Sequence, residues 1–310
     1  MISIVVVSWN SGSDLESCVA SLAAARARSA VAAELIVVDN HSDVPPGEEV
    51  RRHWPDARLA VLSENVGFGP AVNHAAAHAR GEILLLVNPD ARATGDPFPA
   101  IAAAFEAHPD WAAVAPRLVE ARDDGEETQE TFQLRRLPTL RQAARELLLI
   151  DRAFPRNRGR IRDRYLDRDR SSSFEVEQPA AAVLAVRGAA FAGVGGFDPR
   201  FAPAWWEDVD LCARLLPRGK IVYFPEAVFE HAGGAAMGAL GYDRFLPLYY
   251  RNAIAFWRKH HGRTAALVYR ALVAAGMALR ALLLPFRRSS PRPRRESFRA
   301  YGRAFRTAFS

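Results

Sequence analysis

Cysteine is scarce in this chain, with two among 310 residues. Cys18 and Cys212 fall among apolar neighbours on segments with helical spacing, so we expect reduced core residues and no oxidising compartment. The N-terminus also lacks the positive leader and cleavage site of a signal peptide. A hydrophobic content of 49% is ample for a buried core. Together these features favour an intracellular protein with its main domain in the cytoplasm.

Apolar β-branched runs alternate with helical patterns in the first ninety residues. The segment ISIVVVSWN (2–10) is typical of a strand buried on both faces, and ELIVVDN (34–40) and EILLLVN (82–88) repeat that pattern. Strand, helix, strand is the unit of an α/β sheet, in which ligands bind outside the carboxyl ends of the strands. The polar residues expected at those ends are Ser8, Asn10, Asp39, Asn40, Asn88 and Asp90.

A glycine-containing loop follows a shorter predicted strand, Arg58 to Leu62, which is the third in chain order. Gly67 and Gly69 in ENVGFGPAVN (64–73) would let the backbone approach a ligand. The segment is not a dinucleotide fingerprint, because the third glycine is absent and the loop does not follow the first strand. Asp90 has two interpretations: a site carboxylate, or a turn former before the Thr94 loop.

Three carboxylates lie within four positions in WWEDVDL (205–211). They could form the acidic first turn of a helix, where the macrodipole favours them, or a catalytic site. Residues 208 and 210 would point about 200° apart on a helix, so both cannot face one substrate. We therefore expect Asp210 to have a structural role, paired with Arg214 one turn later.

In order and spacing, these motifs resemble those of family 2 glycosyltransferases, particularly the bacterial rhamnosyltransferase-like branch. The match covers roughly residues 2–119 and 179–235, through SWN, VVDN, NVGFGPAVN, NPD, GGFDPRF, WWEDVDLCARL and EH. The resemblance implies the GT-A fold, a Rossmann-like, mostly parallel nucleotide-binding sheet flanked by helices, here with a helical C-terminal tail. It also implies sugar transfer with inversion.

The resemblance assigns donor and metal roles residue by residue. Asp39 would bind the uracil or thymine base and the ribose, with Ser8 and Asn10 completing that pocket. Asp90 resembles the last acid of the family's metal motif and His231 its additional metal or diphosphate contact, for Mn²⁺ or Mg²⁺. Many relatives have a second acid where this chain has Asn88. The other donor-side positions of the match are Asn40, Asn65, Gly67 and Asn73.

On the acceptor side, Asp208 is the expected general base, because an inverting displacement needs a carboxylate to take the proton of the acceptor hydroxyl. Glu207 would orient acceptor hydroxyls. Trp205 and Trp206 would form an apolar platform for a sugar or lipid, or would be ordinary core aromatics. In the GGFD element, the glycines shape the acceptor loop and Asp198 is a further candidate for contact with the donor sugar.

We expect a catalytic domain over 1–235 and a helical, basic region over 236–310. The catalytic domain would comprise a nucleotide-sugar half (1–118), a variable acceptor-side insert (119–178) and an acceptor and catalytic half (179–235). Acids alternate with arginines in the insert and aromatics are few, which argues against nucleic acid and favours a lipid diphosphate acceptor.

The C-terminal region suggests a membrane surface as a partner. Residues 287–310 carry eight arginines and one glutamate, a net charge of +7 (8 − 1). The whole chain carries +6, so the positive excess lies entirely in this segment. Residues 264–286 are long enough to span a bilayer, but two internal arginines would each cost roughly 2.5–3.5 kcal/mol there. We expect an interfacial helix instead, peripheral on the inner face of the cell membrane, or packing on the domain or on a second subunit of a homo-oligomer. In the interfacial arrangement Arg263, Arg270, Arg280 and Arg287 face head groups and Leu267, Leu272, Leu279, Leu282 and Leu283 face inward.

The sequence therefore predicts an inverting, metal-dependent glycosyltransferase of cell-envelope glycan synthesis. The first donor candidate is dTDP-rhamnose, with UDP-galactofuranose and UDP-N-acetylglucosamine as alternatives, and the acceptor is lipid-linked or a polysaccharide. An alternative of a different class is a catalytically silent nucleotide-sugar-binding scaffold on membranes. A nucleotidyltransferase is disfavoured, because no loop rich in glycine, arginine and lysine lies near the N-terminus.

Overall fold

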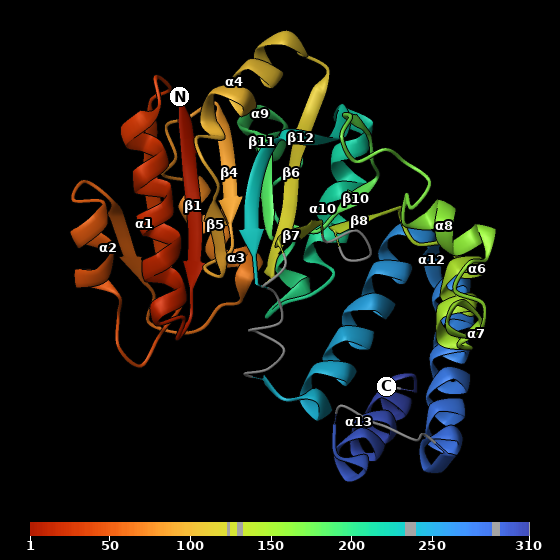
Figure 1. Cartoon of the computed structure of the whole chain (residues 1–310). Helices are drawn as coiled ribbons and strands as arrows, with labels where there is room; N and C mark the ends of the chain where they lie inside the picture. Colours follow the sequence, from red (N-terminus) through yellow and green to blue (C-terminus); the bar gives the residue numbers. More distant parts are fainter. Residues whose placement is uncertain (123–124, 129–132, 233–239, 287–291, 310) are drawn as a thin grey trace. The chain divides into compact units, whose positions relative to one another are not determined.

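The computed structural model describes residues 1–122, 125–128, 133–232, 240–286 and 292–309 (Figure 1). The chain forms two compact units. Unit 1 comprises Met1–Arg136 and Arg168–Gly233, and unit 2 comprises Leu137–Asp167 and Gly234–Ser310. The predicted insert is thus divided between the two units, and its central part clusters with the C-terminal helices.

Unit 1 is built on a ten-stranded, mixed sheet with the order β3-β2-β1-β4-β11-β6-β12-β5, in which β7 also pairs with β6 and β9 with β12. Strands β1 to β4 are mutually parallel, β11 runs antiparallel between β4 and β6, and β6 is parallel to β12. The strands are β1 (Ile2–Ser8), β2 (Ala33–Asp39), β3 (Arg58–Val61), β4 (Ile83–Val87), β5 (Ala91–Ala93), β6 (Trp111–Arg122), β7 (Gly125–Thr128), β9 (Phe174–Glu175), β11 (Val183–Arg187) and β12 (Lys220–His231). A separate two-stranded sheet pairs β8 (Leu134–Arg135) with β10 (Gln178–Pro179).

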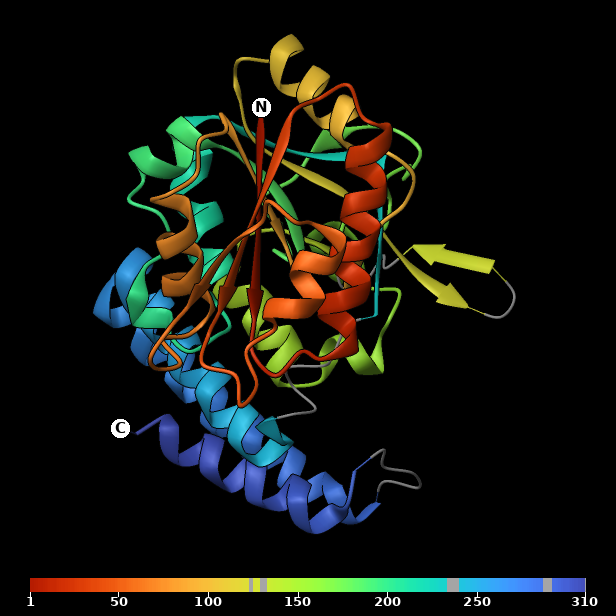
Figure 2. The ribbon, with the colours of Figure 1, turned by 90° about the vertical axis from the view of Figure 1, so that its left-hand side faces the viewer.

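Helices cover both faces of this sheet (Figure 2). Alternate β1 residues Ile2, Ile4 and Val6 share a buried core with α1, α2 and α4. On the opposite face α3 carries Phe68, whose ring packs edge-on against Phe197 after α9. The helices of unit 1 are α1 (Ser13–Arg28), α2 (Gly47–His53), α3 (Phe68–Ala76), α4 (Phe98–Ala107), α9 (Gly188–Gly193) and α10 (Glu207–Leu215), with 3-10 turns η1 (Pro199–Phe201) and η2 (Leu216–Arg218).

The expected α/β class with a mostly parallel sheet is confirmed. Cys18 on α1 and Cys212 on α10 are both buried and free, as their apolar neighbours predicted. Burial raises the pKa of both thiols, so neither is a reactive thiolate.

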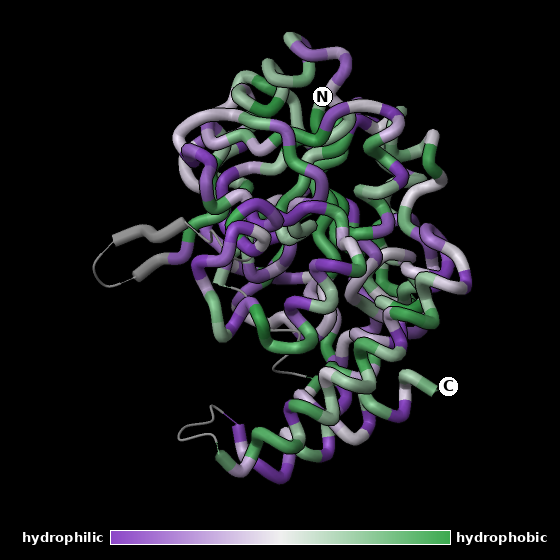
Figure 3. The backbone as a smooth tube through the Cα atoms, turned by 90° about the vertical axis from the view of Figure 1, so that its right-hand side faces the viewer, coloured by the Kyte–Doolittle hydropathy of each residue, from purple (hydrophilic) through white to green (hydrophobic). Residues whose placement is uncertain are grey.

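Unit 2 is helical. Its helices are α6 (Leu140–Leu147), α7 (Ile150–Ala153), α8 (Arg158–Asp163), α12 (Tyr242–Leu283) and α13 (Arg294–Thr307), with the 3-10 turn η3 (Leu284–Phe286). The tube in Figure 3 alternates between hydrophobic and hydrophilic residues along these helices. Gly262 interrupts α12 with a non-helical, left-handed φ of 82°. Residues on both sides of this break are buried, as in Trp257 and Tyr269, whose rings stack at 5.3 Å.

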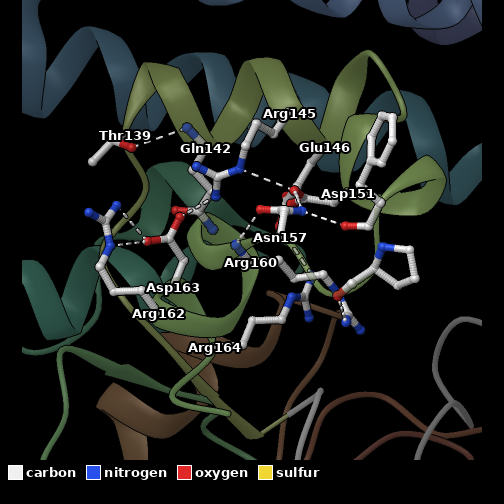
Figure 4. A network of polar contacts seen from close by, with 12 residues as sticks. Thr139, Gln142, Arg145, Glu146, Asp151, Asn157, Arg160, Arg162, Asp163 and Arg164 are labelled. Atoms are coloured by element: carbon white, nitrogen blue, oxygen red, sulfur yellow. Dashed lines mark hydrogen bonds and ion pairs between the residues drawn. The ribbon is translucent and has the colours of Figure 1, made fainter. Parts of the chain in front are cut away.

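A polar network built on Arg145 ties α6 to the two short helices that follow it (Figure 4). The Arg145 guanidinium bonds to Asp151 at 3.1 Å and also to Asp163. Asn157 Nδ2 donates to the same Asp151 oxygen at 2.9 Å. Arg164 pairs with Glu146 at 3.1 Å. Arg145 and Arg164 of the predicted insert are therefore engaged in ion pairs within unit 2.

The arginine face expected on 264–286 is wrong at Arg280. Its guanidinium donates to the carbonyl oxygens of Leu147, Glu146 (3.0 Å) and Gly276 (3.0 Å), so it caps the C-terminal end of α6. Unsatisfied carbonyls at the C-terminal end of a helix attract a cationic donor. In this protein those carbonyls bind the Arg280 guanidinium, which the prediction had assigned to lipid head groups. Leu267, Leu282 and Leu283, which the interfacial arrangement directs toward the membrane interior, are exposed. Arg287 lies outside the described residues.

Candidate active site

The carboxyl ends of β1 and β2 form the first part of the site. Ser8 pairs in register with Asp39, and both side chains are buried. Asp39 Oδ1 accepts a 2.5 Å hydrogen bond from Ser42 Oγ, and its Oδ2 accepts the Ser42 N–H at 3.2 Å. Ser42 Oγ in turn accepts the backbone N–H of Asn10 at 2.8 Å. The three predicted donor residues Ser8, Asn10 and Asp39 therefore share one hydrogen-bonded corner, held by a serine three positions after the aspartate.

Asn40 connects this corner to the glycine loop. Its Nδ2 donates to Asn65 Oδ1 at 3.0 Å, and its Oδ1 accepts the N–H of Val66 at 2.9 Å. Gly67, with φ of 89°, lies so close to Pro203 that a Cβ would come within 2.7 Å of the proline backbone. Only glycine permits both the conformation and the approach. The loop after β3 therefore meets the segment that leads into α10.

Asn73, predicted on the donor side, has its amide engaged elsewhere. Its Nδ2 donates to the carbonyl of Phe197 and its Oδ1 accepts the N–H of Phe197, both at 2.8 Å. Arg214 holds the same turn by donating to the carbonyls of Val194 and Gly196 at 2.7 Å. These contacts fix the GGFD turn between α3 and α10, so the Asn73 amide already has a structural role.

Asp210 is completely buried; its Oδ2 accepts a hydrogen bond from Arg214 Nε at 2.8 Å and forms an ion pair with Arg214 Nη2 at 2.7 Å. The expected i, i+4 pair is confirmed. Because burying an unpaired carboxylate is costly, this acid serves to anchor Arg214 rather than to meet a substrate.

Asp90 and His231 come together through the pairing of β5 with β12. Ala91 lies opposite His231 in that ladder, and the imidazole Nε2 is 3.4 Å from Asp90 Oδ1. The two side chains are 10% and 4% exposed. Among the residues the structure describes, no group of three or more His, Cys, Asp or Glu side chains could hold a metal. A carboxylate and an imidazole nevertheless suit Mn²⁺ or Mg²⁺ when a substrate diphosphate supplies further oxygens, as is usual for these ions.

Glu207 and Asp208 open α10, directly after two tryptophans with left-handed backbone at φ of 69° and 73°. Bulky residues rarely adopt this conformation, and such strain concentrates at functional sites. Burial and the neighbouring Asp208 carboxylate raise the pKa of Glu207 well above its usual value. Within the described part of the chain, its buried Oε2 has no hydrogen-bond partner.

Asp208 has several partners. Burial raises the pKa of its carboxyl, whereas the N–H of Val209, the Arg135 guanidinium and the N–H of Ala181 lower it. The Val209 N–H donates to Oδ1 at 2.8 Å, and Gln178 Nε2 donates to Oδ2 at 3.3 Å.

A short chain of contacts places Asp208 and Asp90 at the same edge of the sheet. Ala181, which donates to Asp208, is adjacent to Ala182, whose carbonyl accepts the N–H of Asn88 at 2.8 Å. Asn88 and Asp90 both follow β4, which pairs antiparallel with β11. The sheet therefore brings the two carboxylates to one edge although 118 positions separate them in the chain.

Comparison with known proteins identifies the family. The model of "Glycosyl transferase family 2" matches residues 3–166. An N-acetylglucosaminyl-diphospho-decaprenol L-rhamnosyltransferase of Mycobacterium tuberculosis (strain H37Rv) is 31% identical over 242 residues, 74% of this chain and 75% of the relative. The chain is a family 2 glycosyltransferase. It belongs to the rhamnosyltransferase-like branch of that family.

Solved structures with the GT-A fold resemble this glycosyltransferase. Staphylococcus aureus TarS 1–349 in complex with UDP has a TM-score of 0.53 at 15% identity, covering 99% of this chain and 90% of that one. GalNAc-T7 with UDP, GalNAc and Mn²⁺ has a TM-score of 0.56 at 15% identity, covering 82% and 47%. At these identities the likeness establishes the fold.

Several residues that contact the candidate site were missed by the sequence analysis. Ser42 could have been found, because a serine three positions after an aspartate often closes a turn by hydrogen bonding to it. Gln178, Arg135 and Pro203 carried no such signal, since their roles depend on contacts between distant segments. Trp206 is 7% exposed, whereas Trp205 is partly exposed, so Trp205 is the more accessible of the predicted platform pair.

Proposed function

We propose that this glycosyltransferase transfers a sugar, with inversion, from a nucleoside diphosphate to a lipid-linked acceptor. Our first donor candidate is dTDP-rhamnose, with UDP-galactofuranose and UDP-N-acetylglucosamine next. The observation that carries the proposal is the convergence of Asp90 and Asp208 at one edge of the sheet. The name of the mycobacterial relative, a rhamnosyltransferase on a diphospholipid-linked N-acetylglucosamine, supports both the sugar and the class of acceptor.

On the donor side, Asp39 and its Ser42 and Asn10 partners would hold the base and ribose. Asp90 and His231 would hold a divalent cation against the diphosphate, and one neighbouring fold contains UDP with Mn²⁺. Such a cation neutralises the charge that develops on the departing diphosphate.

On the acceptor side, Asp208 would accept the proton of the attacking hydroxyl. The unpartnered Oε2 of Glu207 would accept a hydrogen bond from a second hydroxyl of the acceptor, because a buried carboxyl oxygen without a partner gains most from such a bond. Trp205, partly exposed beside them, would contact the apolar face of the sugar.

A thermal-shift panel tests the donor assignment. Ligands that bind the native state raise its melting temperature in proportion to RT ln(1 + [L]/Kd), so the correct donor gives the largest shift. We expect dTDP- or UDP-sugars to stabilise the protein more than GDP-sugars, and only when Mn²⁺ is present. Equal stabilisation by GDP-sugars would contradict the base assignment to Asp39.

We further propose that unit 2 binds the inner face of the cell membrane peripherally. Tyr242–Phe286 is long and apolar enough to cross a membrane by length and composition, but Gly262 breaks it. On α13, by contrast, Phe298 and Phe305 are exposed and lie about 20° apart at 100° per residue, and Phe309, also exposed, follows the end of the helix.

Arginines lie beside this phenylalanine stripe. Arg295, Arg299 and Arg306 are exposed, and no ion pair involves them within the described residues. An exposed aromatic stripe flanked by arginines suits an anionic interface, where rings enter the acyl boundary and guanidinium groups meet head groups.

Replacing Phe298 and Phe305 with serine should weaken binding to anionic liposomes at least about tenfold, because each buried phenylalanine contributes roughly 1.5–3 kcal/mol. Liposome co-sedimentation at two salt concentrations measures this. Val44→Ser, which removes an exposed apolar side chain from unit 1, is the matched control and should bind normally. Unchanged binding of the double variant would exclude α13 as the contact.

A further inference from the structure

The small sheet formed by β8 and β10 lies against the expected catalytic base. Gln178 pairs in register with Arg135 across this sheet. The Gln178 side chain is buried, and its Nε2 donates to Asp208 Oδ2 at 3.3 Å and to the Pro179 carbonyl at 3.2 Å. The second bond orients the amide so that its nitrogen, not its oxygen, meets the carboxylate.

A base in this position must be ionised before the acceptor arrives. Burial of Asp208 opposes its ionisation, and the charge of the Asp208 carboxylate in turn raises the pKa of the adjacent Glu207. Of the other ionisable neighbours on α10, Cys212 is a buried neutral thiol and Asp210 is neutralised by Arg214. Nothing on the helix itself, apart from its backbone N–H groups, favours the anion.

The β8–β10 sheet supplies the interactions that favour the Asp208 anion and that the side chains of α10 do not provide. Arg135 is the cation whose charge lowers the pKa of Asp208. Gln178 provides a neutral donor to Oδ2, while the Val209 N–H occupies Oδ1 at 2.8 Å. Donors on both oxygens fix the plane of the carboxylate, whose two oxygens offer about four acceptor positions in all, so a hydroxyl proton can still be accepted.

We propose that Gln178 and Arg135 are positioning residues that keep the Asp208 carboxylate ionised and aimed at the acceptor hydroxyl. This inference rests on the proposed function, since it assigns a task to residues around its general base. Neither residue touches the substrate in this scheme. Their effect reaches the reaction through Asp208 alone.

The sign of the pH effect follows from the charges. Loss of the Arg135 charge or of the Gln178 hydrogen bond removes an interaction that favours the anion, so the pKa of Asp208 rises. The rate depends on the ionised base. The acid limb of the kcat/KM profile therefore moves to higher pH, and a variant recovers toward the wild-type rate as the pH increases.

Gln178→Leu and Arg135→Gln test the inference, with Arg135→Lys as the charge-conserving rescue. Arg136→Gln is the matched control, because this adjacent arginine pairs with Glu177 near the surface. We expect about tenfold lower kcat at neutral pH for the first two, a smaller loss than the roughly 10²–10⁴-fold assigned to removal of the general base itself. In Gln178→Leu and Arg135→Gln we also expect an unchanged KM for the donor and an acid limb of the kcat/KM profile that is displaced to higher pH. Arg135→Lys and Arg136→Gln should have near-normal kcat and a near-normal pH profile.

Two results would overturn the inference: wild-type kcat in both variants, or a loss that is equal at every pH. The second result would assign the β8–β10 sheet a purely structural role. If Asp208→Asn is inactive while Gln178→Leu and Arg135→Gln behave as wild type, only this inference fails. If the wild-type protein transfers no sugar from any donor, the proposed function fails and takes the inference with it.

Discussion

Replacing Asp208 with asparagine should lower kcat by about 10²–10⁴-fold, the range for loss of a positioned general base. The amide keeps the shape of the side chain and can still accept the Val209 N–H, so the first turn of α10 should remain intact. Because the proposed donor residues lie at the ends of β1 and β2, donor binding should be nearly unchanged. Single-turnover rates and donor affinity, measured on the same preparation, separate the two effects.

Asp210→Asn is the matched comparison for Asp208→Asn, because it changes an acid two positions away on the same helix. Asp210 neutralises the Arg214 guanidinium that clamps the GGFD turn. We expect this variant to lower stability toward urea while its residual folded fraction keeps a near-normal kcat. A normal kcat for Asp208→Asn, or an equal loss in both variants, would contradict the role given to Asp208.

Replacing Asp90 with alanine should abolish the dependence of turnover on Mn²⁺ or Mg²⁺ and lower kcat by about 10²–10³-fold, as when one group that stabilises developing charge is removed. Asp90 and His231 form the proposed metal pair, and Asp90 is its only oxygen ligand. Because these ions prefer hard oxygen ligands, loss of Asp90 should remove most of the affinity for the cation. Activity titrated with each cation after chelation measures the effect.

His231→Gln is the informative companion to Asp90→Ala. The amide oxygen can replace one ligand of the cation, so we expect a smaller loss of activity, and a weaker preference for Mn²⁺ over Mg²⁺ because the imidazole is removed. Wild-type turnover that persists undiminished in a chelator would contradict the metal role of both residues.

The parts of the fold that follow from local pattern were predictable from the sequence. The short β-branched runs before Ser8 and Asp39 are strands, because a continuous apolar run of this length and composition is typical of an extended segment buried on both faces. The i, i+4 spacing of Asp210 and Arg214 sufficed to predict their ion pair. In each case the contacting residues are close in the chain.

Features that depend on long-range pairing were not predictable in this way. His231 lies close to Asp90 because β5 and β12 pair antiparallel. No local sequence pattern predicts that pairing. Arg280 was expected to face lipid, because at 100° per residue it falls within an arc of about 120° with Arg263, Arg270 and Arg287. Its contacts with the end of α6 appear only when both helices are folded.

The most direct test of the account is a transfer assay that measures both products at once. The purified enzyme is incubated with Mn²⁺, dTDP-rhamnose or a UDP-sugar, and an N-acetylglucosaminyl-diphospholipid, and both the glycosylated lipid and the free nucleoside diphosphate are quantified. The account predicts equal amounts of the two products, with an inverted anomeric centre, and neither product from Asp90→Ala or Asp208→Asn at comparable times. Glycosylated lipid formed by the Asp208→Asn variant at the wild-type rate, or with retained configuration, would contradict it.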